Sequence, residues 1–356
     1  MKVRFIGQMM KKGYSGGRLM ALIYAEALAS TSITVDFLVN NIPEMYEDFR
    51  PFSRIDLVQT NFNNLSPLVD KNVDVVFIVP GGNISYHGEA LRHGIECHAK
   101  IVLLNFETPN WFNLLSPYKK PPEMWAGWEL ISEYADLIFS ISGEGNKYAK
   151  LFYTKVPRKC IFNYSYGSIN SHLADSVPES HEKEKNIISL TRISPHKGFN
   201  ILDPLINTNL AGYTFYLILG NGVISKKEEK HWHKKFDKVN MKFVVRSAIK
   251  GYEKFALLKQ SSLLYFPTRF EGFGIPPLEA AYCGLPVACS DLPVLREFGK
   301  DAFTYGNPED SVSMKNCVIE ALQSRERVEK EHSRIKRIGK MEEAGKNLLK
   351  VLENIF

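Results

Sequence analysis

Short apolar runs alternate with helix-like segments along most of this chain, and this alternation constrains the fold more than any other feature. In the first half the runs occupy 3–6, 34–39, 73–79, 101–105 and 137–141. In the second half they occupy 186–190, 214–219, 242–245, 263–266 and 286–289. Runs of this length suit strands buried on both faces, and the helix-like segments between them suit crossover connections. The pattern therefore predicts an α/β fold with parallel sheets covered by helices.

The alternation is interrupted at 171–185, where the sequence is polar, contains a proline and a charge cluster, and has few aliphatic residues. We predict an interdomain linker there. A length of 356 residues also exceeds one ordinary core. The predicted domains are 1–170 and 186–338. The last segment, 339–356, carries apolar residues at helical spacing and is expected to form a helix that could pack back on the first domain.

The composition is that of a soluble globular protein, with 44% hydrophobic and 24% charged residues. No apolar run approaches the length needed to span a bilayer, and the first residues form a predicted strand, not a secretory signal. The five cysteines are an odd number and widely spaced, which favours reduced thiols. We therefore expect a cytoplasmic protein, with peripheral contact at the inner face of a membrane left open.

The charge pattern argues for small anionic ligands more than for nucleic acid. The net charge of +6 is mild, and no basic stripe with interleaved aromatic residues is present. The histidines at 87, 93 and 98, with Cys97, do not repeat on one helical face. We therefore expect neither a metal site nor a bound cofactor.

The segment 269–281, with the sequence RFEGFGIPPLEAA, carries two carboxylates eight positions apart, Glu271 and Glu279. Gly272 and Gly274 allow a ligand to approach the backbone closely, and the two prolines that follow suit the first turn of a helix. The positive end of that helix would attract a phosphate. The alternative is an ordinary helix start supported by two acidic residues.

Two cations lie just after the first strand of the second domain. Arg192 follows this strand and Lys197 comes five residues later, before a predicted helix. A guanidinium fork and an ammonium at the carboxyl end of a strand are well placed to neutralise a diphosphate. The alternative is a solvated basic turn.

The sequence Glu-Gly-Phe-Gly-Ile-Pro-Pro-Leu-Glu-Ala, followed by Cys-Gly-Leu-Pro-Val, resembles the E-x7-E signature of the retaining GT-B glycosyltransferases of family 4. The resemblance implies two Rossmann-like domains whose parallel sheets face each other across a cleft. It assigns contacts with the donor sugar to Glu271 and binding of the ribose hydroxyls to Glu279. Backbone groups at the sugar and diphosphate would come from Phe273, Gly274, Ile275 and Leu278.

Other segments resemble the same family in the same order. Arg192 and Lys197 match its "GR…KG" element, with Thr191 where glycine is more usual. The glycine pair Gly16 and Gly17 resembles the loop of the first domain that faces the donor.

Two weaker matches concern the nucleotide. Gly220 follows a strand in a glycine turn that lines the nucleotide pocket in this family. Ala248 and Ile249 fall where the family holds the base through backbone groups.

The acceptor side is less well defined by sequence. Many relatives carry a histidine near the reacting carbon at about Phe106, and this chain does not. Glu107 is the predicted substitute, with Asn110 and Trp111 as further acceptor-side residues. A purely structural Glu107 is an equally good interpretation.

The resulting hypothesis is a metal-independent glycosyltransferase that moves a sugar from a nucleoside-diphosphate sugar to a hydroxyl acceptor with retention. The acceptor is expected to be a saccharide or a lipid-linked glycan. Two alternatives stay open: a non-catalytic sugar-nucleotide-binding subunit, and another GT-B enzyme such as an epimerase. An NAD-dependent oxidoreductase is disfavoured because the chain lacks a GxGxxG fingerprint.

Overall fold

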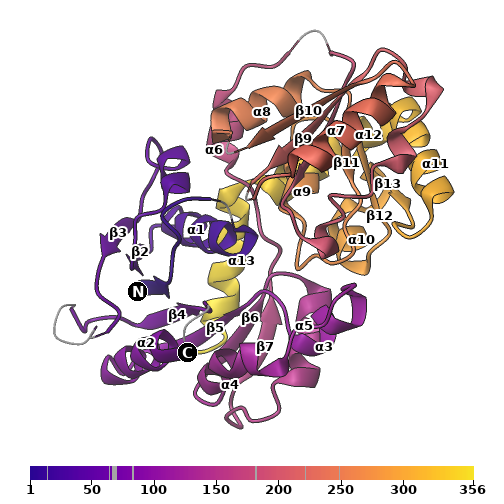
Figure 1. Cartoon of the computed structure of the whole chain (residues 1–356). Helices are drawn as coiled ribbons and strands as arrows, with labels where there is room; N and C mark the ends of the chain where they lie inside the picture. Colours follow the sequence, from indigo (N-terminus) through magenta and orange to yellow (C-terminus); the bar gives the residue numbers. More distant parts are fainter. Residues whose placement is uncertain are drawn as a thin grey trace.

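The computed structural model describes residues 1–13, 15–63, 65, 70–81, 84–180, 183–220, 222–247 and 249–356. Two parallel sheets, each with its own helices, divide these residues between two halves of the molecule (Figure 1). This arrangement confirms the predicted α/β class with two Rossmann-like halves.

The first sheet has seven strands in the order β3-β2-β1-β4-β5-β6-β7, and every pairing is parallel. Its central strands are almost completely buried, because helices cover both faces of a parallel sheet. The strands are β1 (Lys2–Gly7), β2 (Thr34–Val39), β3 (Asp56–Gln59), β4 (Val75–Val79), β5 (Lys100–Asn105), β6 (Leu137–Ser140) and β7 (Ile161–Tyr164).

The second sheet repeats this plan with six strands in the order β10-β9-β8-β11-β12-β13. Its first strand in the chain, β8, again lies between two neighbours that come later in the sequence. The strands are β8 (Asn186–Thr191), β9 (Thr214–Leu219), β10 (Lys242–Ser247), β11 (Leu263–Phe266), β12 (Val287–Ser290) and β13 (Phe303–Gly306).

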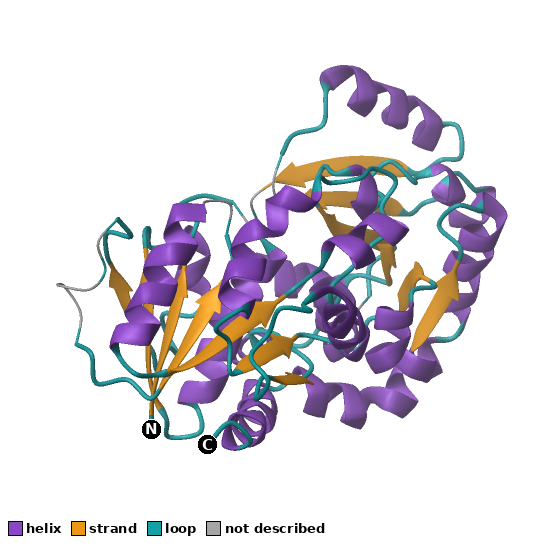
Figure 2. Cartoon of the chain, turned by 90° about the horizontal axis from the view of Figure 1, so that it is seen from below, coloured by secondary structure: helices purple, strands orange, loops and turns teal. Residues whose placement is uncertain are grey.

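Helices connect the strands and cover the sheets, as the view from below makes clear (Figure 2). None of the helices in the described ranges is both long enough and apolar enough to cross a bilayer. The first half carries α1 (Gly16–Ala29), α2 (Ile84–Glu96), α3 (Pro109–Leu115), α4 (Ala126–Ser132) and α5 (Gly143–Phe152). The rest of the chain adds α6 (Ser171–Ser176), α7 (Lys226–Asp237), α8 (Gly251–Gln260), α9 (Ile275–Tyr282), α10 (Pro293–Gly299), α11 (Ser311–Gln323), α12 (Arg325–Gly339) and α13 (Met341–Glu353).

The segment between the halves is more ordered than its composition suggests. Residues 171–185 contain α6, whose first turn is capped by the side chain of Asn170. Leu173 and Ala174 are buried, and α6 packs against α8. Two buried apolar side chains and one N-terminal cap therefore stabilise this short helix within an otherwise polar segment.

The end of the chain crosses from one half to the other. Helix α12 packs on α9, whereas α13 packs along α1 in the first half, next to the N-terminus (Figure 1). The two backbones approach closely at Gly345, where an added Cβ would lie 2.0 Å from the carbonyl oxygen of Ala27. A glycine is therefore required at this helix–helix contact.

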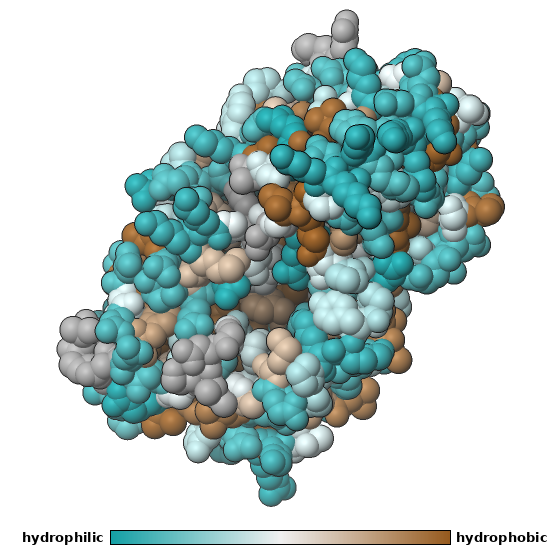
Figure 3. All heavy atoms as spheres, viewed as in Figure 1, coloured by the Kyte–Doolittle hydropathy of each residue, from teal (hydrophilic) through white to brown (hydrophobic). Residues whose placement is uncertain are grey.

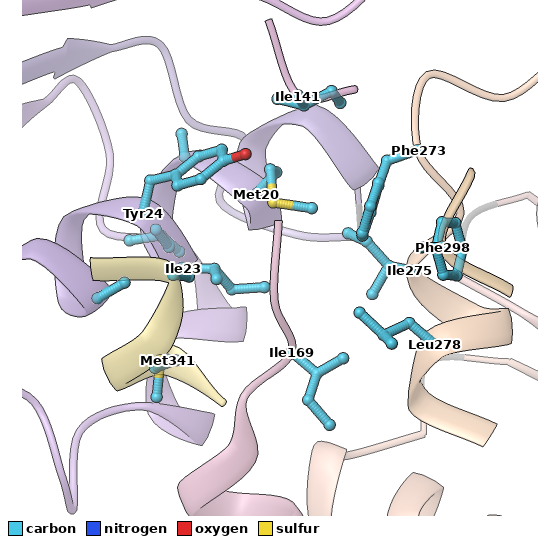
Figure 4. Close-up of a cluster of buried hydrophobic side chains, with 14 of the residues drawn as sticks. Met20, Ile23, Tyr24, Ile141, Ile169, Phe273, Ile275, Leu278, Phe298 and Met341 are labelled. Atoms are coloured by element: carbon cyan, nitrogen blue, oxygen red, sulfur yellow. The ribbon is translucent and has the colours of Figure 1, made fainter. Parts of the chain in front are cut away.

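An apolar cluster joins the two halves beside the crossing point. Figure 4 shows side chains from α1, from α13 and from the second half pointing toward one another. Ile169, on the connecting segment, lies among them and is fully buried. The members labelled in the figure are Met20, Ile23, Tyr24, Ile141, Ile169, Phe273, Ile275, Leu278, Phe298 and Met341. The halves therefore share a continuous core.

The strand order fixes where a ligand can bind. In each sheet the chain leaves its first strand in one direction and later returns on the other side, so that β1 and β8 mark the points where the direction changes. Open parallel sheets bind ligands beyond the carboxyl ends of the strands at such points. The two carboxyl edges face each other across the boundary between the halves.

Candidate active site between the two sheets

A cavity of about 540 Å³ lies between the halves, and the surface is hollowed at this boundary (Figure 3). Its walls come from both carboxyl edges. The first half contributes the start of α1 and the ends of β4, β5 and β6, through residues such as Gly16, Arg18, Gly81, Glu107 and Ile141. The second half contributes the segments after β8, β9, β10 and β11, including Arg192, Gly220, Ile249 and Glu271.

Glu271 lies at the centre of the second-half wall with Lys197. The Lys197 ammonium donates to Oε1 of Glu271 at 2.7 Å, and the Thr268 hydroxyl lies 3.1 Å from the same oxygen. Among the described residues, Oε2 of Glu271 has no hydrogen-bond partner. One carboxylate oxygen is thus fixed, and the other is free to accept from a ligand hydroxyl.

The pKa of Lys197 is lowered by burial and, to a smaller extent, by the nearby Arg192 charge. The carboxylate of Glu271 acts in the opposite direction. A buried cation that is only partly neutralised favours binding of an additional anion beside it.

Two arginines from opposite halves reach the same cavity. Arg192 follows β8, and Arg18 lies in the first turn of α1. Arg18 is held by its Nε–H, which donates to the carbonyl of Gln8 at 2.6 Å. Within the described part of the chain, neither guanidinium pairs with a carboxylate.

Burial lowers the pKa of Arg18, and the charge of Arg192 lowers it further. Two cations that repel each other across a cavity form a site for a multiply charged anion, because one ligand between them would relieve the repulsion.

Glu279, in α9, is almost completely buried and pairs with Lys254 of α8 at 2.5 Å. Burial raises its pKa, while the ammonium of Lys254 opposes this effect. The pair uses Oε1, so Oε2 is left for ligand hydroxyls at the edge of the cavity. This geometry suits a vicinal diol such as that of ribose.

The turn before α9 is shaped by two glycines. Gly274 has φ of 114°, in the region that favours glycine, and a Cβ there would lie 2.5 Å from Leu295. At Gly272 a Cβ would lie 2.4 Å from the carbonyl oxygen of Phe106, in the opposite half. The turn therefore brings the second half into backbone contact with the first, next to Glu271.

His196 is a buried histidine in the wall of the cavity, 2% exposed. Its Nε2 lies 3.4 Å from Arg192, and its Nδ1 contacts the hydroxyls of Ser194 at 2.7 Å and Tyr118 at 3.1 Å. Because a guanidinium can only donate, Nε2 accepts and the neutral ring carries its proton on Nδ1. Tyr118 belongs to the first half, so His196 also joins the two halves.

On the opposite wall Glu107 pairs with Lys120 at 2.8 Å. The ammonium of Lys120 also lies 3.7 Å from the ring centre of Phe112. Both charged side chains line the cavity. A carboxylate is thus available in the first half, across the cavity from Glu271.

The structure brings most of the predicted residues to one place. The cavity is lined by Gly16, Gly17, Glu107, Arg192, Lys197, Gly220, Ile249, Glu271, Phe273, Gly274, Ile275 and Glu279. Ala248 lies outside the described residues.

Three predicted residues do not line the cavity. Trp111 is 1% exposed; its ring stacks on Tyr148 and meets Phe270 edge to face. Asn110 faces outward and donates to the carbonyl of Tyr148. Leu278 points into the core between the halves. The sequence predicts a polar-aromatic loop after β5 that reaches Trp111, but Asn110 and Trp111 lie in α3, and the ring of Trp111 packs inward.

Four charged or polar side chains of the site were not among the predicted residues: Arg18, Lys120, His196 and Lys254. Lys254 and Lys120 lie outside the motifs that the sequence offers, and each is identified only by its contact with a carboxylate, Glu279 or Glu107, in the folded protein. Arg18 directly follows the glycine pair, and an arginine in the first turn of a helix was a usable signal. Within the described ranges no group of three or more His, Cys, Asp or Glu could hold a metal ion.

Residues 173–341 match the family described as glycosyl transferases group 1. The matched stretch is just under half of the chain and includes β8 to β13 and all the site residues of the second half. A further similarity links the chain to the O-antigen chain mannosyltransferase B of Escherichia coli, at 40% identity over 58 residues, or 16% of this chain and 15% of that protein. The chain spans less than a fifth of the length of the two curated mannosyltransferases it matches.

Solved structures extend the similarity of this chain to the whole fold. Sucrose-phosphate synthase from Thermosynechococcus elongatus superposes with a TM-score of 0.73 at 14% identity, covering 100% of this chain and 99% of the other. HepE from Anabaena, solved with UDP, gives a TM-score of 0.72 at 15% identity, covering 99% and 100%. At this identity the likeness establishes the GT-B fold, as the sequence predicted.

Proposed function

We propose that this chain transfers a sugar from a nucleoside-diphosphate sugar to a hydroxyl acceptor, with retention of anomeric configuration and without a metal ion. The observation that carries the proposal is the pair of arginines, Arg18 and Arg192, which form no ion pair with any described carboxylate and line one cavity together with Glu271 and Glu279. Cations for a diphosphate and carboxylates for hydroxyls are the two kinds of group that a nucleotide sugar requires.

The donor would lie along the second half. Glu279, fixed by Lys254, would accept hydrogen bonds from the ribose hydroxyls. The diphosphate would lie between Arg192 and the start of α9. The backbone N–H groups there would come from Gly274 and Ile275, since the next two residues are prolines and have no N–H to donate. Glu271 would then accept from the sugar hydroxyls.

The chemistry follows from this placement. Breaking the bond between the anomeric carbon and the diphosphate places more negative charge on the leaving phosphate oxygen. Arg192, Lys197 and the start of α9 stabilise that charge more strongly in the transition state than in the ground state. Positive charge developing on the sugar would be stabilised by Glu271. We assign no covalent nucleophile, and retention rests on the resemblance to family 4.

On the acceptor side, Glu107 is the carboxylate of the first half that lines the cavity. It is placed to accept a hydrogen bond from the incoming hydroxyl, and Lys120 keeps it in position. The similar proteins support this assignment of substrates. They include an O-antigen chain mannosyltransferase and a sucrose-phosphate synthase, and HepE was solved with UDP and with UDP-glucose.

Thermal stabilisation by a panel of UDP-, GDP-, ADP- and dTDP-sugars tests donor binding. A ligand at 100 times its dissociation constant should stabilise the fold by about 2.7 kcal/mol. Replacing Glu271 with alanine should abolish transfer and leave nucleoside-diphosphate binding nearly unchanged, whereas Glu279→Ala should weaken that binding. No stabilisation by any nucleotide sugar or nucleoside diphosphate would refute the proposal. Binding without transfer to any glycan acceptor would favour the non-catalytic binding subunit.

A further inference from the structure

A second cavity, of about 510 Å³, lies beside the first on the outer part of the first sheet. It opens above the carboxyl ends of β1, β2 and β3. We call it the amide groove, because its described lining is dominated by the side chains of Gln8, Asn40, Gln59, Asn61 and Asn63. Nothing in the donor-binding scheme uses these residues.

Strand register explains why the amides gather there. Gly7 pairs with Val39, and Val39 pairs with Gln59, so the three strands end at the same level. The next residues in the chain, Gln8 and Asn40, therefore emerge side by side at the edge. The three-strand edge and the turn after β3 together present amide groups over one continuous surface.

The groove has the chemistry of a site for hydroxyl groups. None of the described lining residues carries a charge, although the chain as a whole has a net charge of +6. Each amide side chain both donates and accepts, which matches the dual character of a sugar hydroxyl. Phe62 supplies an apolar surface and is itself stacked on Tyr86 at 4.9 Å.

Part of the lining is fixed and part is open. Asn40 accepts from the backbone N–H of Met9 through Oδ1, and Gln59 donates to the carbonyl of Asn40. Among the described residues, the Nδ2 of Asn40, the Oε1 of Gln59 and the side-chain amide of Gln8 have no hydrogen-bond partner. The groove thus combines anchored side chains with free donor and acceptor atoms.

The amide groove adjoins the first cavity at Gln8. The carbonyl oxygen of Gln8 accepts from Arg18, which lines the first cavity. Gly81, also in that lining, is close enough that a Cβ there would lie 3.1 Å from the Oε1 of Gln8. A ligand could therefore extend from one cavity into the other along the edge of the sheet.

We propose that the amide groove binds the sugar units of a neutral oligosaccharide acceptor that lie beyond the reacting hydroxyl. This inference rests on the proposed function, because it takes the acceptor to react beside Glu107. From β5, whose carboxyl end leads into Glu107, to β2 there are three strand spacings, or about 14 Å at ~4.8 Å each. The sugar unit that reacts beside Glu107 would therefore lie outside the groove, and the sugar units further along the acceptor would lie over the amide side chains.

The test measures binding of neutral mannose and glucose oligomers, one to four units long, to full-length protein saturated with UDP, using ligand-observed NMR. A glucuronic acid oligomer serves as the charged comparison. The variants are Gln59→Leu and Gln8→Leu in the groove, and Gln323→Leu, an exposed glutamine at the end of α11, as the matched control.

We expect affinity to rise with length, with at least a fivefold gain between one and three units. Gln59→Leu should remove most of this gain without changing binding of the single sugar, and Gln323→Leu should have no effect. Absence of binding by every neutral oligomer, affinities independent of length and of both groove variants, or preference for the charged oligomer would overturn the inference. Donor stabilisation does not involve Gln59, so failure of the groove would leave the proposed function standing, whereas failure of the proposed function would appear separately as the absence of donor stabilisation.

Discussion

At the scale of single residues, His196 shows how a cation-rich site constrains a neighbouring histidine. Burial, together with Lys197, Arg192 and Lys120, lowers its pKa from 6.5 to about 2. The phenol of Tyr118 also faces the ring. A protonated ring here would add another positive charge to a site already prepared for an anion, so the histidine acts as a neutral hydrogen-bonding bridge.

This perturbation has a predictable effect on stability. Between pH 6.5 and the lowered value, the unfolded chain binds a proton at this position and the folded chain does not, so stability falls as the pH falls. The contribution of His196 should decrease by roughly 1.5 kcal/mol between pH 6.5 and pH 5. Urea unfolding of the wild type and of His196→Phe at a series of pH values measures this contribution, as the difference between the two proteins in how the free energy of unfolding changes with pH. Parallel slopes for the two proteins would contradict the assignment.

The same residues show the limit of sequence-based prediction at a site. Glu271, Glu279, Arg192 and Lys197 were predictable because each belongs to a short motif whose spacing has a physical meaning. Lys254 was not, because its importance comes only from its contact with Glu279 after folding. Side chains recruited across the fold leave no local pattern in the sequence.

At the scale of elements, most of the predicted strands are buried interior strands. The missed strands β3, β7 and β13 all lie at sheet edges. Strands β3 and β7 are partly exposed along their length, so they lack the continuous apolar runs that mark a strand covered on both faces. Strand β10, also at an edge, was recognised because its sequence retains aliphatic residues.

The docking of α13 on α1 gives an element-scale prediction. Gly345→Ala would place a methyl group against the carbonyl of Ala27 and force the helices apart, at a cost of about 1–3 kcal/mol. Gly88→Ala is the matched control, since it lies inside α2 with nothing within 4 Å of the added Cβ. The control should stabilise by about 0.5–1 kcal/mol through helix propensity. Thermal unfolding of both variants checks the prediction. Equal changes in Tm would contradict it, since they would mean that α1 and α13 can move apart at little cost in free energy.

At the scale of the whole molecule, the two halves touch at defined points around the cavity. Glu297 of α10 accepts hydrogen bonds from the backbone N–H groups of Gly143 and Glu144, at 2.8 and 2.5 Å. These groups form the start of α5 in the opposite half. The adjacent Ser142 hydroxyl donates to the carbonyl of Gly272 at 2.9 Å. A carboxylate at the positive end of a helix therefore fastens the second half to the first, directly beside the turn that carries Glu271.

Replacing Glu297 with glutamine should weaken this fastening, because an amide keeps one acceptor and loses the charge that favours the helix N-terminus. A loss of about 1–2 kcal/mol would shift the closed arrangement toward open forms. Since both halves line the proposed donor site, with Arg18 in the first and Arg192 in the second, donor affinity should fall by about tenfold. X-ray scattering should show a larger radius of gyration in the free variant that UDP reverses. Glu343→Gln, which breaks an exposed pair with Lys346 on α13, should change neither quantity. A variant at Glu297 with wild-type dimensions and affinity would show that the apolar cluster alone holds the halves together.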